Sequence, residues 1–454
     1  MFAGSLAAVG ERELGALENK ASSEVPVDWF LSQDHCRETW TMQIKTVLNR
    51  VHKIKGFVYG KVRFAGDQIE VDVRPRKGSR PICSGCGEPG PGYDTLWERH
   101  FRFVPLWAIG VVLVYAMRRV DCPGCGVTVE QVPWGNGKRH LTRAYAVFLA
   151  RWARRLSWNE VASIFNTSWE HVYRSVAWVV AYGLQHRRLD GITAIGVDEV
   201  QFQKGHRYLT VVYQINAGCR RLLWVGQDRT AKTLLRFFRM LGRERTAAIQ
   251  FVCSDMWRPY LKVIAKKAGQ AIHILDRFHI VARLNKALDE IRAAEAKQLV
   301  RQGYEPMLKH SRWCFLKREE NLTDSQQVKL ADLMQYDLKS VRGYLLKQSF
   351  QLLWEYVSPY WAGRFLDGWV ARAMRSRLEP IKTVARSIRS HRELILNWFK
   401  AKKEFNSGIV EGLNYKIKLT LRKAYGYREL KVAEIAIYHA LGQLPEPELT
   451  HRFC

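Results

Sequence analysis

The spacing of apolar residues predicts a small sheet followed by helices in the first part of the chain. Around residues 101–106 and 111–117 the apolar positions alternate or run together, which is typical of β-strands. The apolar run over 104–117 is too short to cross a bilayer and is flanked by arginines, so we interpret it as buried strands and expect no membrane span. After Arg143 the spacing becomes helical, and it predicts one short helix to about Phe165 and a second from Trp169 to about Val180.

A second strand-rich region begins at Gly191. Its pattern predicts strands at 192–200, 207–215 and 221–226, then a helix at 231–241, a strand at 248–253, a helix around 261–267 and a strand at 271–275. Three strands followed by alternating helices and strands is the order of an RNase H-like fold. Residues 286–404 show only helical patterns, so the expected fold class is multidomain α/β with an all-helical insertion.

The composition adds a strong positive charge. The 454 residues include 72 Lys and Arg against 43 Asp and Glu, a net charge of +29. A folded chain with so much self-repulsion favours a polyanionic partner. The basic residues are spread along the whole chain and form neither one tail nor one amphipathic helix. Nucleic acid therefore explains them better than a membrane surface or a ribosome-associated role.

The first 41 residues differ from the rest. They hold seven acidic and three basic residues, a charge of −4, and show no apolar periodicity. No signal peptide is expected, because a basic start and a sustained apolar stretch are both missing. We therefore predict a poorly ordered extension at 1–41, with Met42 as an alternative functional start.

Four of the nine cysteines form two similar CxxCG motifs. Cys83 and Cys86 belong to the first motif, and Cys122 and Cys125 to the second. The glycine after each second cysteine lets backbone amides turn toward the thiolates, and four sulfurs complete a tetrahedral Zn²⁺ shell. A redox pair or chance spacing explains a repeated motif less well. We expect a structural Zn²⁺ in a zinc-ribbon module at 42–135, and the five isolated cysteines favour a reducing cytosol.

Two capping motifs lie ten residues apart in the helical region. Ser157 and Glu160 form one, and Thr167 and Glu170 form the other. Two short helices joined by a tight turn are the geometry of a helix-turn-helix, whose second helix enters a major groove. We expect this unit at 140–185, although two capped helices are also common in domains that bind no DNA. The residues expected to contact DNA are His171, Tyr173 and Arg174.

Acidic residues occupy two informative positions, because inside an apolar strand a carboxylate is costly unless it binds a cation or a hydrogen-bond donor. Asp198 interrupts an apolar strand, and Asp255 follows the strand at 248–253. In the RNase H arrangement these strands are neighbours, so the two carboxylates would converge and bind Mg²⁺ or Mn²⁺. Glu199 is expected on the other side of its strand, because side chains alternate.

A third carboxylate is expected from a later helix. Glu411, Asn414 and Lys418 share one face at i, i+3 and i+7, and Asn406 or Ser407 can cap this helix. That face offers a carboxylate to a metal, and an amide and an ammonium group to a DNA phosphate.

A structural role stays open for each acid taken alone. Asp198 and Asp255 could cap strand ends and Glu411 could be a solvated helix residue, whereas together they favour a two-metal site. Asp228 and Asp276 are the main alternative carboxylates. The segment 276–279 would bring His279 near the site, or it is a structural turn.

Together these motifs resemble the insertion-sequence transposases of the ISL-three type, which have a DDE core. The resemblance runs from Met42 to about Leu444. It rests on the paired CxxCG motifs, the helix-turn-helix and the acidic segments 196–199, 254–257, 276–279 and 407–414. It implies that Asp198, Asp255 and Glu411 are the catalytic triad, and that Asp276 and His279 belong to a DxxH turn of accessory function.

The resemblance implies a bacterial enzyme that acts at the nucleoid in the cytoplasm. It would bind the terminal inverted repeats of an insertion sequence, cut DNA with two metal ions and transfer the strand to target DNA, as a homo-oligomer. The alternative is a catalytically silent DNA-binding regulator derived from such an enzyme. An RNase H-like nuclease or junction resolvase would need neither the zinc module nor the insertion.

The domain boundaries expected from these patterns place the core on both sides of the insertion. The insertion carries five tryptophans, at positions 313, 354, 361, 369 and 398, which either contact DNA and flipped bases or pack the helices. The expected boundaries are 1–41 for the extension, 42–135 for the zinc module, 140–185 for the helix-turn-helix, 190–285 and 405–445 for the core, and 286–404 for the insertion.

Overall fold

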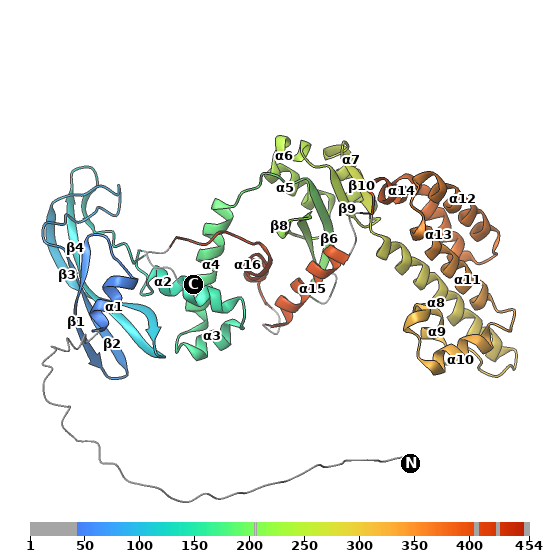
Figure 1. The fold of residues 1–454 in the computed structure, drawn as a ribbon, viewed down its shortest axis with the longest axis horizontal. Coiled ribbons are helices and arrows are strands. Elements are labelled where there is room, and N and C mark those ends of the chain that lie inside the picture. Colours follow the sequence, from blue (N-terminus) through green and yellow to red (C-terminus); the bar gives the residue numbers. More distant parts are fainter. Residues whose placement is uncertain are drawn as a thin grey trace, which may run out of the picture.

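The computed structural model describes residues 43–135, 137–203, 205, 207–403, 408–423 and 427–448. Figure 1 shows three parts in a row: an N-terminal sheet with helices beside it, a central sheet, and a helical part at the far end. The extension expected at 1–41 and the possible start at Met42 lie outside the described residues, so they stay predictions.

The N-terminal sheet has a compact aromatic core. Its strand order is β1-β2-β4-β3, and β5 pairs with β4. The rings of Phe57, Tyr115 and Trp134 meet edge to face, with centroids 4.8 to 5.5 Å apart. The strands predicted at 101–106 and 111–117 are confirmed as parts of β3 and β4. The elements are α1 (Ile44–Val51), β1 (Phe57–Ala65), β2 (Gln68–Pro75), β3 (Gly92–Leu106), β4 (Ile109–Cys122) and β5 (Gly126–Val129).

Three helices follow, α2 (Arg143–Ala153), α3 (Trp158–Ile164) and α4 (Trp169–His186). The capping box predicted at Ser157 is confirmed at the start of α3. The one predicted at Thr167 is wrong by one residue, because the hydroxyl of Ser168 accepts from the backbone of His171 at 3.2 Å. Helix α4 also runs past the expected end near residue 180, since its apolar side packs on α2 and on α16 (Leu430–Leu441).

The central sheet has the strand order β10-β9-β6-β7-β8. Strands β6, β7 and β8 are antiparallel neighbours, whereas β9 runs parallel to β6 and β10 runs parallel to β9. The order of strands and helices predicted for 192–275 is confirmed, with a short added helix α6. The elements are β6 (Ala194–Gln203), β7 (Arg207–Asn216), β8 (Cys219–Gln227), α5 (Ala231–Leu241), α6 (Arg243–Ala247), β9 (Phe251–Ser254), α7 (Arg258–Lys267) and β10 (Ile272–Leu275).

Helices cover this sheet from two directions. On one side α5 and α7 pack on it, in a core that includes Ile195 and Val197 of β6. The intervening Gly196 contacts Val410 of α15 (Gly408–Lys423), which packs on β6 and β7. Successive residues of β6 therefore face different helices, as the alternation of a strand requires.

The far part is helical throughout, as predicted for 286–404. Helix α8 starts directly after β10 and leads away from the sheet (Figure 1). Of the five tryptophans, Trp369 is buried, Trp354 and Trp398 pack against each other at 5.3 Å, and Trp313 and Trp361 are exposed. The helices are α8 (Arg277–Arg301), α9 (Arg312–Leu316), α10 (Asp324–Leu333), α11 (Lys339–Gln351), α12 (Pro359–Arg375), α13 (Glu379–Ser390) and α14 (Arg392–Lys400), with 3-10 turns η1 (Glu319–Asn321) and η2 (Leu352–Glu355).

The C-terminal helix α16 joins the first two parts. It packs on α4 and on β8. After it, the chain crosses α4 at Gly183, where a Cβ would lie 2.5 Å from Leu444. Glu446 then pairs with Arg151 at 2.9 Å and with Arg154 at 3.1 Å. The residues after α15 thus tie the first helices to the central sheet.

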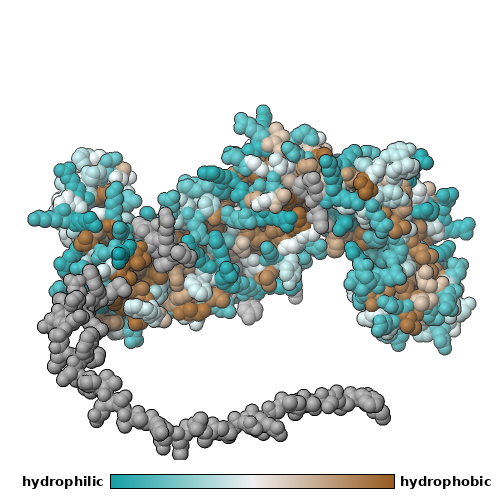
Figure 2. Space-filling model, viewed as in Figure 1, coloured by the Kyte–Doolittle hydropathy of each residue, from teal (hydrophilic) through white to brown (hydrophobic). Residues whose placement is uncertain are grey.

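Hydrophilic residues predominate on the face of the molecule seen in Figure 2. Among the described residues, no helix combines the length and the apolar character needed to cross a membrane.

Candidate functional site

Three aspartates lie on or directly after three neighbouring parallel strands: Asp198 within β6, Asp255 after β9 and Asp276 after β10. The pairing of β6 with β9 ends at Gly196 opposite Cys253, so Asp198 and Asp255 each come two residues after the last paired position. The pairing of β9 with β10 ends at Ser254 opposite Leu275, and the next positions are Asp255 and Asp276. All three aspartates line one small cavity. The structure thus brings together the two carboxylates that the sequence expected to converge.

Asp198 is held by a chain of hydrogen bonds from α15 and β7. The amide nitrogen of Asn414 donates to Oδ2 at 2.6 Å, and the backbone amide of Glu199 donates to Oδ1 at 2.8 Å. The hydroxyl of Tyr213 donates to the amide oxygen of Asn414 at 2.7 Å. Burial raises the pKa of Asp198. Asn414 therefore orients Asp198, and because its amide nitrogen has a second N–H and borders the open cleft, the predicted contact to a DNA phosphate stays a prediction.

The position of α15 depends on a missing side chain. A Cβ on Gly196 would lie 2.6 Å from Cγ2 of Val410 and 3.4 Å from Cγ2 of Ile215. The helix can therefore approach β6 more closely than any residue with a side chain would permit. Val410 directly precedes Glu411, so this contact sets where Glu411 lies relative to Asp198.

Glu411 and Lys418 line an open cleft of about 590 Å³ next to the cavity of the aspartates. Both side chains are exposed on α15, and Asp198, Asp276 and His279 line the same cleft. Nε2 of His279 lies 3.8 Å from Oδ2 of Asp276. Asp198 and Asp276 border both spaces, so the predicted accessory residues lie at the site. The capping residues expected at 406 and 407 lie outside the described residues.

Arg229 connects the second aspartate to a further carboxylate. Its Nη2 lies 3.1 Å from Oδ2 of Asp255, and its Nε lies 2.8 Å from Oε1 of Glu199, without hydrogen-bond alignment in the second case. Burial first, and Asp255 second, raise the pKa of Glu199 to about 8. The guanidinium stacks 4.6 Å from the ring of Trp257, whose backbone amide donates to Asp255 Oδ1 at 2.9 Å.

The sequence placed Glu199 on the other side of its strand from Asp198, but Glu199 lines the same open cleft as Asp198 and shares Arg229 with Asp255. Sequence reasoning did not find Arg229. The available signal was an arginine between the end of the strand at 221–226 and the start of the helix at 231–241, at the same edge of the sheet as both aspartates. The alternative Asp228 is exposed, with a backbone φ of 69°, and lines neither space.

The carboxylates of Asp198, Asp255 and Glu411 are suitable ligands for a hard divalent cation, but the three do not converge on one point. Mg²⁺ prefers carboxylate oxygens and keeps several waters. Among the described residues, only the four cysteines bring three or more His, Cys, Asp or Glu ligand atoms within 4.8 Å of one another. Shared coordination of one ion by Asp198, Asp255 and Glu411 thus requires their side chains to approach one another.

The four cysteines of the two CxxCG motifs form one cluster. Gly87 and Gly126 adopt positive φ angles of 79° and 71°, as expected for the turns after each second cysteine. Hydrogen bonding, first from Thr128, lowers the pKa of Cys83 to about 6, whereas hydrogen bonds to the other thiols raise the pKa of Cys125 to about 12. Four converging sulfurs are the donor set of a structural Zn²⁺ site.

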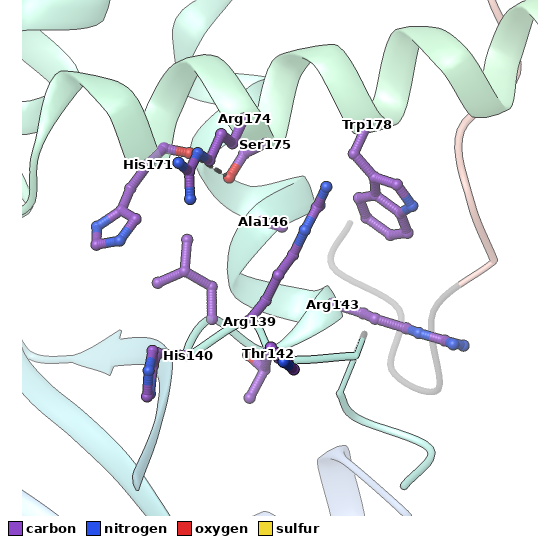
Figure 3. A pocket seen from close by; sticks show the side chains of 11 residues that line it. Arg139, His140, Thr142, Arg143, Ala146, His171, Arg174, Ser175 and Trp178 are labelled. Atoms are coloured by element: carbon purple, nitrogen blue, oxygen red, sulfur yellow. Dashed lines mark hydrogen bonds between the residues drawn. The ribbon is translucent and has the colours of Figure 1, made fainter. Parts of the chain in front are cut away.

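The residues predicted to contact DNA divide into two groups. His171 and Arg174 line a pocket together with residues that precede and begin α2, shown in Figure 3. The ring of Tyr173 instead packs between Trp158 and Trp169, at centroid distances of 5.6 and 6.2 Å. The ring of Tyr173 therefore contributes to the packing of α3 against α4.

Comparison with known proteins agrees with this arrangement. A family model described as a transposase, of the DDE type named after ISL3, matches residues 195–437. The transposase for insertion sequence element IS1557 of Mycobacterium tuberculosis is 32% identical over 80% of this chain and 86% of its own length. The transposase for insertion sequence element IS1001 of Bordetella parapertussis is 29% identical over 77% of this chain and 86% of its own. The chain belongs to the ISL3 family of DDE transposases of insertion sequence elements.

Proposed function

We propose that this transposase cuts and joins DNA at a site formed by Asp198, Asp255 and Glu411, which together bind Mg²⁺ or Mn²⁺. The observation that carries the proposal is that Asp198 of β6 and Asp255, directly after the parallel neighbour β9, line one cavity. Glu411 lies across the adjoining cleft, to which Asp198 also belongs. Three carboxylates at one edge of a sheet are a donor set for two-metal phosphodiester chemistry.

The protein's own residues prepare this chemistry. The chemistry supplied by two bound divalent ions is a lowered pKa of the attacking water and positive charge at the leaving oxygen. Asn414 and Tyr213 fix the orientation of Asp198. Lys418 borders the same cleft and can hold the scissile phosphate. After cleavage, the released 3′-OH would attack target DNA at the same site.

The element order supports an RNase H-like core at 190–285 and 405–445. Three antiparallel strands flanked on one side by two parallel strands have the order expected for that fold. The insertion at 286–404 separates β10 from α15, and α8 crosses the boundary at 286, so it belongs to both parts. The four-cysteine cluster supports a zinc-ribbon module with a structural Zn²⁺ at 42–135, and α3 and α4 support a helix-turn-helix at 140–185.

We infer that the DNA partners are the terminal inverted repeats of the element and a target site. His171 and Arg174 are our candidates for the repeats, with Tyr173 supporting them, and Lys418 is our candidate at the cleaved phosphate. Because two ends must be joined, the working form would be a homo-oligomer on DNA. With chromosomal DNA as its substrate, the enzyme would act at the bacterial nucleoid in the cytoplasm.

The test is strand cleavage by the full chain on labelled duplexes that carry the ends of its own element, in Mg²⁺ or in EDTA. We expect cleavage in Mg²⁺ only, lost in Asp255→Ala while binding is retained. Asp276→Ala serves as the comparison, because Asp276 borders the same spaces. If Asp276→Ala abolished cleavage and Asp255→Ala did not, the triad assignment would be wrong. Binding without cleavage by the wild type would favour the regulator.

A further inference from the structure

A strongly basic pocket lies between α4 and the segment 137–143, which we call the strap. The pocket has a volume of about 290 Å³, at the low end of the roughly 300–1,000 Å³ typical of ligand sites. Figure 3 shows His171, Arg174, Ser175 and Trp178 on the α4 side, and Arg139, His140, Thr142 and Arg143 on the side of the strap. Six of its residues are basic and none is acidic, the basic ones being Lys138, Arg139, His140, Arg143, His171 and Arg174.

The strap is fixed to strand β3 of the N-terminal sheet. The guanidinium of Arg99 donates to the carbonyls of Gly137 and Arg139 at 3.3 and 3.2 Å. The backbone amide of Arg102 donates to the carbonyl of His140 at 2.8 Å, and that of Thr142 donates to the carbonyl of Arg102 at 2.9 Å. The strap therefore presents its basic side chains from a rigid support that is continuous with the zinc-binding sheet.

The charges in the pocket lack a buried counter-ion among the lining residues. Burial first, and then Arg102 and Arg174, lower the pKa of His171. The carboxylate of Glu170 pairs with Arg174 at 2.7 Å, but both side chains are more than half exposed. Such a surface pair contributes little and exchanges readily. An anion entering the pocket would relieve the repulsion between its cations.

The position of the pocket on α4 indicates which anion. His171, Arg174, Ser175 and Trp178 lie on one face of α4 at i, i+3, i+4 and i+7. In a helix-turn-helix, the first residues of the second helix reach the base edges, and the contacts around them go to the backbone phosphates. The pocket begins in the first turn of α4 and continues along the helix. If the first turn reads base edges, a backbone phosphate would lie next to this part of the helix.

We propose that this pocket binds a phosphodiester group of the transposon-end DNA, gripped from one side by α4 and from the other by the strap. The zinc-binding module then sets the position of the helix-turn-helix on the duplex through Lys138 and Arg139. This inference rests on the proposed DNA-binding role of α4. It assigns the strap, which no sequence motif singled out, to the same DNA-binding unit.

The test compares binding of the full-length Lys138→Ala/Arg139→Ala variant with wild type, by fluorescence anisotropy on the end duplex over a series of salt concentrations. We expect roughly tenfold weaker binding, and a plot of log affinity against log salt that is less steep by about 1 to 2, since each phosphate contact contributes about 0.9. The matched control is Lys53→Ala/Lys61→Ala, which removes the same charge from exposed positions of the zinc-binding module that holds the strap. An unchanged slope in the strap variant would overturn the proposal.

A second measurement locates the phosphate. Duplexes with a single uncharged methylphosphonate, scanned along the end sequence, should reveal at least one position that weakens wild-type binding and has no effect on the strap variant. Equal sensitivity of both proteins at every position would also overturn the proposal. If the wild type cleaves its ends while the strap variant binds like wild type, this inference fails and the proposed function stands. If the wild type does not bind its ends, the proposed function fails first.

Discussion

Gly196 of β6 and Val410 of α15 meet at a distance that leaves no room for a side chain on residue 196. A Cβ there would lie 2.6 Å from Cγ2 of Val410. The two residues are far apart in the sequence. Gly196 comes two residues before Asp198 and Val410 directly before Glu411, both proposed metal ligands. The distance between Glu411 and Asp198 therefore depends on residue 196 being a glycine.

Gly196→Ala should displace α15 and separate Glu411 from Asp198. Overpacking of this kind costs typically about 1–3 kcal/mol. A shift on the order of 1 Å is enough to lower the cleavage rate about a hundredfold. Cleavage and binding assays on the end duplex would separate the two effects, because end binding by the N-terminal parts should be retained.

Two further variants make the test specific. Val410→Ala removes the methyl group that the new Cβ would strike, so the double variant should recover part of the activity. Gly218→Ala is the matched control, because a Cβ there would meet nothing within 4 Å. Full activity in Gly196→Ala would show that α15 does not need this close contact.

Arg229→Ala should destabilise the protein more in EDTA than in Mg²⁺. The substitution leaves Glu199 and Asp255 without their shared guanidinium, and their side chains are only 9% and 11% exposed. We expect a loss on the order of 1–3 kcal/mol in EDTA, reduced because Arg229 itself is partly exposed. A divalent cation at Asp255 would replace much of the missing positive charge.

Urea unfolding of wild type and Arg229→Ala, each with and without Mg²⁺, measures this difference. Arg245→Ala, which breaks a more exposed pair with Asp190, should cost little under either condition. The same loss for Arg229→Ala in EDTA and in Mg²⁺ would argue against a cation at Asp255.

Cys83→Ser should remove the bound zinc and unfold the N-terminal sheet. Structural zinc sites contribute several kcal/mol to folding, because the ligands converge only in the folded state. Zinc content measured by a colorimetric chelator and the near-ultraviolet signal of the aromatic core report the two effects. Cys219→Ser, outside the cluster, should keep both. Wild-type protein that holds no zinc after purification with added metal would contradict the assignment.

His439 of α16 should make stability fall at low pH. Burial, with Arg154 and Lys423 nearby, lowers the pKa of His439 to about 3, so the folded state excludes a proton that the unfolded state binds below its ordinary value of 6.5. The stability is thus present above pH 6.5 and is lost as the pH falls toward 3, by up to about 1.4 kcal/mol per pH unit.

The comparison of wild type with His439→Leu at pH 7, 6 and 5 isolates this residue. The variant should lose less stability on acidification, whereas His273, whose pKa burial lowers to about 4, titrates in both proteins. Parallel curves for the two proteins would mean that His439 takes up its proton in the folded state.

Elements with strong local signals were predicted well. Helix α5 matches the predicted span 231–241, because Thr230 caps its start, Gly242 ends it, and the residues between them follow an amphipathic pattern. Helix α4 was predicted too short, since the packing that extends it comes from α16, more than two hundred residues away. The cap of α4 was misplaced because Thr167 and Ser168 are adjacent hydroxyl residues, and only the backbone path selects between them.

The site residues that could be predicted are those whose own position in the sequence pattern is unusual. A carboxylate inside an apolar strand or directly after one identifies Asp198 and Asp255, and the strand order brings them together. The partners of these carboxylates were not predictable, because Arg229 and Tyr213 come from segments whose local pattern shows only a turn and a buried strand. The hydrogen bond of Asn414 to Asp198 was not predictable for the same reason, because it depends on the approach of α15 to β6.

The late position of α15 and α16 in the chain has a consequence for synthesis. During translation, the N-terminal sheet, helices α2 to α4 and strands β6 to β10 all leave the ribosome before the helical part and well before Glu411. Domains fold as they emerge, from the N-terminus onward. A nascent chain could thus bind DNA while it still lacks its third carboxylate and the helix that fastens α4 to β8. A ribosome that stops before residue 430 would release a DNA-binding protein without a firmly attached catalytic sheet.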